Sequence, residues 1–276
     1  MNILRNPNPL EIKYAIEYHL YEFWKSWFTS GIKNIEYEEG EEFFKFSTNI
    51  PLFWLNGVLD TKFSSNAAEE RIQENILYFK KKNHPFSWFT GPLTKPNDFR
   101  DLLIKNGFTL LLEYPGMAYN LKNLVEKQEL DPNLEIIKVE NDETLKVWNE
   151  VIISGYQIPE ELPSDFLKNI YSKIFLNEDS SASAFLAYYN GKPVATSGVL
   201  YRGGVAGIYN IATIKEERGK GIGTTITLAA LYEAKKLGYE LVVLHSLEKG
   251  LNLYKRIGFK EYCKLQRFVW DPNSNE

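Results

Sequence analysis

The sequence lacks four features that would each point to a particular class of protein. Cys263 is the single cysteine among 276 residues, so the chain can form neither an intrachain disulfide nor a thiolate cluster for zinc. The formal net charge is -4, and the absence of a basic excess argues against nucleic-acid binding. No apolar run approaches the roughly 20 residues of a membrane span, and the first twenty residues hold no apolar signal-peptide core. We therefore expect a cytoplasmic protein without nucleic-acid, membrane or metal partners.

The composition is that of an ordinary globular protein. Hydrophobic residues make up 44% of the chain and charged residues 25%, which is enough for a sizeable core. A length of 276 residues suits one large domain or two domains of about 130 to 140 residues.

Two stretches of the sequence follow the same order of patterns. The segments that start at Phe86 and at Tyr239 each predict a strand, a loop, a short helix, a Gly-Phe pair and another strand. The glycine of each pair, Gly107 or Gly258, suits the left-handed position that ends a helix. Upstream, strand-like runs holding Asn56 and Asn210 each precede a longer helical stretch. We interpret this as a tandem duplication, although the similarity that all helix–strand units share remains an alternative.

The expected boundary between the halves is the charged segment LVEKQELDPNLE, residues 124–135. It gives domains at 1–126 and 134–276. The second half then predicts a strand (IIKVEN), two helices (DETLKVWNEVIISGY and PSDFLKNIYSKIFL) and three strands. Those strands are separated by turns at residues 190–191 and 202–204, of which the Asn-Gly turn is a hairpin signal.

A glycine-rich loop lies between the last of these strands and the next helix. The strand-like run ends near Thr213, the loop runs from Arg218 to Gly223, and the helix is expected from about Thr224, with Thr224 and Thr225 as its caps. Glycines allow the backbone to approach phosphate oxygens, and the first amides of a helix lack internal partners. We therefore expect a pyrophosphate to be surrounded by the amides of Gly219, Lys220, Gly221, Ile222, Gly223 and Thr224, with positive charge from Arg218 and Lys220. The P-loop and dinucleotide-binding patterns do not fit this loop.

Arg218, Gly221 and Gly223 form the pattern R-x-x-G-x-G, and LVVLHS followed by LNLYKRIGF comes later in the chain. In these motifs residues 135–276 resemble the GCN5-related N-acetyltransferase (GNAT) family, and the whole chain looks like tandem GNAT proteins. The resemblance implies an α/β (α+β) fold of two GNAT-like domains, each with a mixed, mostly antiparallel sheet flanked by helices. It also implies acetyl-CoA as the cofactor.

The resemblance implies further site residues. The backbone of Ile211, Ala212 and Thr213 would pair with the pantetheine arm, and Asn252 and Ser246 would contact that arm. Tyr254 matches the position of the family's general acid and would protonate the departing thiolate. His245 is either a base or a structural histidine, so the sequence assigns no general base.

The first half has no comparable loop. No glycine occurs between Gly57 and Gly91, and Leu103 stands where the second half has Tyr254. We expect 1–126 to be a degenerate copy that binds no coenzyme A. Its Trp54, Trp88 and Tyr114 are then either a wall of the acceptor cleft or core residues.

The sequence thus favours an N-acetyltransferase that moves an acetyl group to a primary amine of a small molecule or peptide. The alternative is a non-catalytic acyl-CoA sensor or scaffold, and Tyr254 at the acid position favours catalysis over it. A tandem aminoacyl transferase that uses aminoacyl-tRNA is disfavoured by the pI of about 5.6. The acceptor is not readable from the sequence, and neither is the oligomeric state, so a homodimer remains open.

Overall fold

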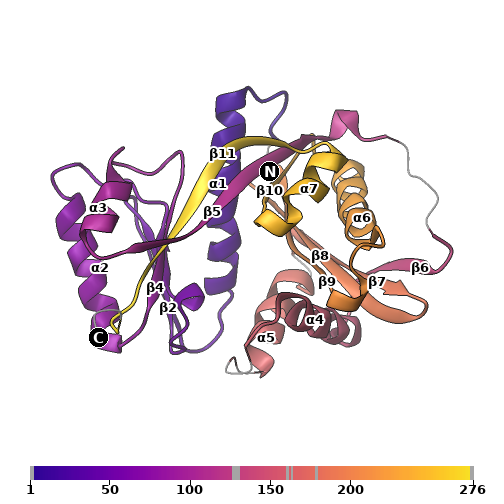
Figure 1. Cartoon of the computed structure of the whole chain (residues 1–276), viewed down its shortest axis with the longest axis horizontal. Helices are drawn as coiled ribbons and strands as arrows, with labels where there is room; N and C mark the ends of the chain where they lie inside the picture. Colours follow the sequence, from indigo (N-terminus) through magenta and orange to yellow (C-terminus); the bar gives the residue numbers. More distant parts are fainter. Residues whose placement is uncertain (1–2, 126–130, 160–161, 163, 178–179, 274–276) are drawn as a thin grey trace. The chain divides into compact units, whose positions relative to one another are not determined.

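A computed structural model describes residues 3–125, 131–159, 162, 164–177 and 180–273 (Figure 1). The chain separates into two compact units, and each combines two separate stretches of sequence. The large unit comprises Met1–Ser30 and Met117–Tyr262, and the small unit comprises Gly31–Gly116 and Cys263–Glu276.

The large unit is a six-stranded mixed sheet with helices against it. Its strands follow the order β5-β10-β9-β8-β7-β6, in which β10 and β9 are parallel and β9-β8-β7-β6 are successively antiparallel. The elements are α1 (Pro9–Phe28), the end of β5 (Thr109–Asn120), η2 (Leu121–Asn123), β6 (Leu134–Lys138), α4 (Asp142–Tyr156), α5 (Ser164–Phe175), β7 (Ala182–Tyr189), β8 (Lys192–Arg202), β9 (Val205–Thr213), η3 (Lys215–Glu217), α6 (Ile222–Lys236), β10 (Leu241–His245), α7 (Glu248–Ile257) and the start of β11 (Lys260–Trp270).

Local sequence explains the ends of these elements. The predicted hairpin turn places Asn190 and Gly191 at φ 51° and 73°, the left-handed conformation that a tight two-residue turn requires. Helix α1 begins with a capping box, in which the Asn8 side chain accepts from backbone amides and the Glu11 side chain reaches back to the Asn8 amide. The buried face of α1 then packs on the sheet, where it contacts β8, β9 and β10.

The small unit has a five-stranded mixed sheet of order β1-β2-β3-β4-β11. Strands β3 and β4 are parallel, and the other neighbours are antiparallel. Its elements are β1 (Ile35–Glu39), β2 (Phe44–Thr48), η1 (Phe53–Leu55), β3 (Gly57–Leu59), α2 (Ala68–Lys82), β4 (Phe86–Thr90), α3 (Phe99–Lys105), the start of β5 and most of β11. Aromatic side chains dominate the core, including Phe86, Trp88 and Phe268.

The structure confirms the mixed α/β fold and the repeated order of elements. The series β3-α2-β4-α3-β5 and β9-α6-β10-α7-β11 correspond, and each contains one parallel strand pair. The final strands are exchanged, however. Residues 266–270 of β11 pair with β4 in the small unit, whereas the end of β5 lies beside β10 in the large unit.

The compact units therefore differ from the expected ranges 1–126 and 134–276. Two physical causes account for the difference: α1 packs on the sheet of the large unit, and the last strand of each copy, β5 or β11, ends in the other unit. Residues 126–130 of the expected linker lie outside the described residues. Cys263 lies on β11 and is half-buried, in agreement with the predicted strand.

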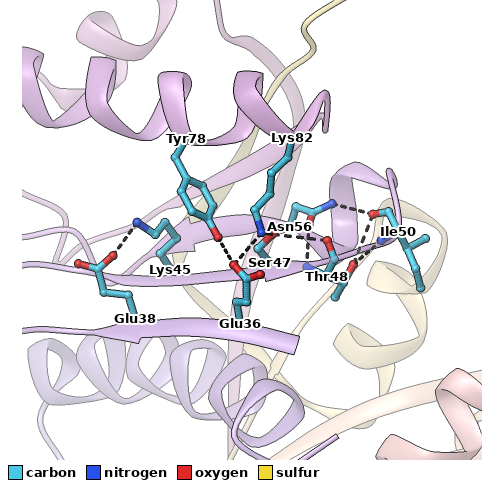
Figure 2. A network of polar contacts seen from close by, with 9 residues as sticks. All are labelled: Glu36, Glu38, Lys45, Ser47, Thr48, Ile50, Asn56, Tyr78 and Lys82. Atoms are coloured by element: carbon cyan, nitrogen blue, oxygen red, sulfur yellow. Dashed lines mark hydrogen bonds and ion pairs between the residues drawn. The ribbon is translucent and has the colours of Figure 1, made fainter. Parts of the chain in front are cut away.

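Asn56 has a different local structure from the one expected. It follows the 3-10 turn η1, and only the three residues after it form a strand. Its buried side chain accepts from the Thr48 amide at 2.9 Å and donates to the Ile50 carbonyl (Figure 2). It also donates to the Leu52 carbonyl. Asn56 thus braces the chain between β2 and β3.

Within the part of the chain that the structure describes, no helix combines the length and apolarity needed to span a membrane.

Candidate cofactor groove

A groove of about 550 Å³ lies in the large unit. It is bordered by the end of β9, the loop that leads into α6, the helix α7 and the C-terminus of α4. Most residues that the sequence singled out line it: Ile211, Ala212, Thr213, Arg218, Gly219, Gly221, Ile222, Gly223, Thr224, Asn252 and Tyr254. Lys220 and Ser246 do not.

The groove opens where two parallel strands part. The pairing of β9 with β10 covers only Ala206 and Gly207 on the β9 side. Further along, the register of β9 against β8 shifts between Thr196 and Gly198, and Asn210 takes a left-handed φ of 54°. This is a β-bulge, which bends a strand and redirects its backbone groups. Beyond the bulge β9 stays paired with β8 but has left β10, so its free edge faces the groove.

The glycine loop has the geometry of an anion site. Gly219 and Gly221 both have φ of 82°, which L side chains rarely adopt. Gly221 is the N-cap of α6, which begins at Ile222, so the expected cap role of Thr224 and Thr225 is wrong. Both threonines lie in the first turn, where their amides donate to the Gly221 carbonyl. The amides before them lack helical partners and point out of a positive helix end.

The two cations of the loop are placed differently. The Arg218 Nε donates to the Thr213 carbonyl and its Nη2 donates to the Gly155 carbonyl, both at 2.9 Å. Arg218 therefore sits at the groove between β9 and α4. The Lys220 ammonium instead forms an exposed ion pair with Glu217 at 2.7 Å.

Tyr254 lines the groove from α7, which ends at Gly258 with φ of 111°. Its ring packs edge-on against Phe259, with the ring centres 5.8 Å apart. Burial raises the pKa of Tyr254, and the nearby Tyr156 raises it further, so the phenol keeps its proton at neutral pH. Among the described residues the Tyr254 hydroxyl has no hydrogen-bond partner. It is a neutral donor available to a group in the groove.

Ser246 and Asn252, the two predicted contacts of the cofactor arm, lie in different environments. Asn252 is exposed at the rim of the groove. Ser246 is fully buried and its Oγ donates to the Leu247 carbonyl at 2.8 Å, so it braces the turn into α7.

His245 lines the groove as a neutral imidazole. Its Nε2 donates to the Ile16 carbonyl of α1 at 2.9 Å, and burial lowers its pKa to about 4. A second buried histidine, His19, donates from Nε2 to the Leu200 carbonyl, and its Nδ1 lies 2.8 Å from the Tyr209 hydroxyl, which donates to the His19 carbonyl. These contacts anchor α1 to the sheet through polar groups.

Sequence reasoning missed the contribution of α1 and that of Tyr156. The Asn8–Glu11 capping box could have predicted where α1 begins, but local patterns carry no information about which sheet a helix covers. Tyr156 is the last residue of α4, and its hydroxyl donates to the Ile211 carbonyl at 3.1 Å. No motif in the sequence marked it.

The corresponding place in the small unit is closed. The Trp88 indole donates to the Thr61 hydroxyl at 2.8 Å, and the Lys95 amide donates to the Thr61 carbonyl at 2.9 Å. A parallel bridge also joins Lys62 to Lys95. The chain after β3 is therefore tied to the chain after β4, where the large unit has its groove. Trp88 is a core residue.

Part of the sequence is similar to known acetyltransferases. The family model described as "Acetyltransferase (GNAT) family" matches residues 146–259. N-alpha-acetyltransferase 30 of Schizosaccharomyces pombe is 38% identical over 61 residues, which span 21% of this chain and 41% of the relative's length.

Two solved structures share the fold of most of the chain. A GCN5-related N-acetyltransferase from Kribbella flavida has a TM-score of 0.72 at 16% identity and covers 95% of this chain and 96% of its own. A tandem GNAT protein from the clavulanic acid biosynthesis pathway has a TM-score of 0.64 at 11% identity and covers 88% of this chain and 85% of its own.

Among the described residues, no group of three or more histidine, cysteine or carboxylate side chains is arranged to hold a metal ion.

Proposed function

We propose that the large unit transfers an acetyl group from acetyl-CoA to a primary amine of a small molecule or peptide, and the match of residues 146–259 to the GNAT family model supports this. The observation that carries the proposal is the groove itself. It has a glycine loop of anion-binding geometry and Arg218 at one end, and a partnerless phenol, Tyr254, on its wall. A binding protein needs the first feature but not the second.

The residues present suit the cofactor. The amides of 219–224 and the Arg218 guanidinium would hold the pyrophosphate, because both supply positive charge without needing to move far. The free edge of β9 at Ile211 and Thr213 would pair with the amides of the pantetheine arm. Acetyl-CoA supplies an acetyl group activated as a thioester.

Tyr254 would act at the bond that breaks. Attack of the amine nitrogen on the acetyl carbon of bound acetyl-CoA would break the carbon–sulfur bond and release the sulfur as a thiolate. Tyr254 would give its proton to that sulfur and regain one from solvent, while the amine loses one proton. A phenol of ordinary pKa, about 10, already holds its proton at neutral pH, and burial raises the Tyr254 pKa further, so the proton is present.

The deciding experiment measures thiol release from acetyl-CoA against a panel of amines. The curated relative is named an N-alpha-acetyltransferase, so peptides with free α-amines belong on the panel beside small primary amines. Amine-dependent thiol release supports the proposal. Binding of coenzyme A without release on any amine would favour the sensor reading, and absence of binding would refute both.

Lys220 offers a control for the site. Arg218→Gln should weaken acetyl-CoA binding, whereas Lys220→Gln should change it less, because Lys220 does not line the groove and its charge is already paired with Glu217.

A further inference from the structure

The free edge of β9 carries side-chain hydrogen bonds at both of its outward carbonyls. The Ile214 amide donates to the Val194 carbonyl, so residue 214 faces β8. Alternate residues of a strand face opposite edges, so Ile211 and Thr213 face away from β8. The Ile211 carbonyl accepts from the Tyr156 hydroxyl, and the Thr213 carbonyl accepts from Arg218. Side chains thus occupy backbone acceptors of an edge that could otherwise pair with an added strand.

Both side chains are also tied to the C-terminus of α4. Tyr156 ends the helix, and Arg218 also donates to the carbonyl of Gly155. Gly155 itself lies so close to β9 that an added Cβ would come within 2.7 Å of the Ala212 Cβ. Together these contacts of Gly155, Tyr156 and Arg218 hold the end of α4 against the edge of β9.

The pantetheine arm of coenzyme A needs the same edge. The arm contains two secondary amides, so it can add to a strand edge as a peptide does, and each amide N–H seeks a backbone carbonyl. The Ile211 carbonyl is the outward acceptor nearest the bulge, and the Tyr156 hydroxyl already occupies it.

We propose that Tyr156 gates the arm site: its hydroxyl must leave the Ile211 carbonyl before an amide of coenzyme A can pair there. This inference rests on the proposed function, because it assumes that the groove takes coenzyme A. The side chain has room to move, since 43% of its surface is exposed. Desolvation raises the pKa of Tyr156 to about 12, so the hydroxyl stays a donor to the carbonyl.

The Tyr156→Phe variant keeps the ring and removes only the competing donor. We expect it to bind coenzyme A about 2- to 10-fold more tightly, the range that corresponds to the net value of one exchanged hydrogen bond. Adenosine 3′,5′-bisphosphate carries the nucleotide end without the arm, so its affinity should be the same in both proteins.

Tyr171→Phe is the matched control. Its hydroxyl donates to the Asn210 side chain at 3.3 Å, one residue from Ile211, but Tyr171 does not line the groove. This variant should bind coenzyme A as the wild type does.

Isothermal titration of the three proteins with both ligands tests the gate. Tighter coenzyme A binding by Tyr156→Phe alone, with unchanged bisphosphate binding, supports it. Equal or weaker coenzyme A binding, or an equal gain for both ligands, overturns the gate and leaves the proposed function standing. Failure of all three proteins to bind coenzyme A overturns the proposed function and the gate with it.

Discussion

At the residue scale, the glycines of the cofactor loop are required for different reasons. At Gly221 an added Cβ would meet no heavy atom within 4 Å, so the demand is for the left-handed backbone at φ 82°. At Gly223 an added Cβ would lie 3.1 Å from the Leu253 Cδ1, so the demand there is for space. Gly221 is therefore the cleaner position for testing the anion site.

We predict that Gly221→Val weakens coenzyme A binding by about 10- to 100-fold. A β-branched side chain disfavours the left-handed conformation, and the loop amides would turn away from the pyrophosphate, losing one or two charge-assisted hydrogen bonds. Gly191→Val is the control, because Gly191 also has a positive φ of 73° and open space but lies in a hairpin turn outside the groove. Calorimetric affinities that fall equally in both variants would contradict the assignment of the loop.

The Tyr254→Phe variant tests the acid role. The ring would still pack against Phe259, and the glycine loop would be untouched, so coenzyme A affinity should stay near that of the wild type. Loss of the proton donor should lower kcat by on the order of 10²- to 10⁴-fold, with a similar fall in kcat/KM. The measurement is steady-state thiol release with an amine from the panel.

A structural role for Tyr254 would give the reverse outcome. The Phe variant would then melt at a lower temperature yet keep more than about a third of the wild-type kcat, under conditions where chemistry limits the rate. In that case another group protonates the thiolate, and the cofactor assignment is unaffected.

At the scale of elements, local chemistry made the glycine loop and α7 predictable. The helix that follows the loop and the glycine that ends α7 both depend on neighbours within a few residues, such as Gly221 and Gly258. The start of α6 came out two residues late because Thr224 looked like a cap, whereas Gly221 already fills that position.

The elements that sequence did not predict depend on distant contacts. The bulge at Asn210 arises from the pairing of β9 with β8, and the amino-acid types there also suit a regular strand. The packing of α1 on β8 to β10 joins residues about 180 to 230 positions apart, as in the bonds from His19 and to Ile16. Hydrophobic periodicity identifies a helix, but it does not name the sheet that the helix covers.

Distant contacts also distinguish the parallel pair β3–β4 of the small unit from the pair β9–β10 of the large unit. The absence of glycine after β3 predicts that the small unit binds no coenzyme A, and the structure adds an observation that points the same way. Thr61 takes hydrogen bonds from Trp88 and from the Lys95 backbone, so the polar groups that could meet a ligand are already paired within the protein.

At the scale of the whole molecule, neither half of the sequence contains a complete compact unit. Residues 134–276 lack α1 and the end of β5, which both belong to the large unit. A boundary placed in the charged segment 124–135 therefore separates residues 134–276 from α1, whose Ile16 carbonyl accepts the hydrogen bond of His245. Experiments on the groove need the full chain.

The anchoring of α1 makes stability depend on pH. Burial lowers the pKa of His19 to about 3 and that of His245 to about 4, from an ordinary value of 6.5. Between those values the unfolded chain binds protons that the folded chain does not. The stability contribution of each neutral imidazole is complete above pH 6.5 and is lost as the pH falls toward 4.

We predict that the free energy of unfolding falls by about 2 kcal/mol for each of these histidines between pH 7 and pH 5. The His19→Gln variant has no imidazole at this position, and its amide can still bond to Leu200 or Tyr209. Chemical denaturation of both proteins at several pH values measures the effect. The stability advantage of the wild type over this variant should shrink by about 2 kcal/mol across the range, while contributions from carboxylates cancel in the difference. An advantage that stays constant from pH 7 to pH 5 would mean that His19 can be protonated without unfolding. The polar anchor between α1 and the sheet would then tolerate a charge that its burial should exclude.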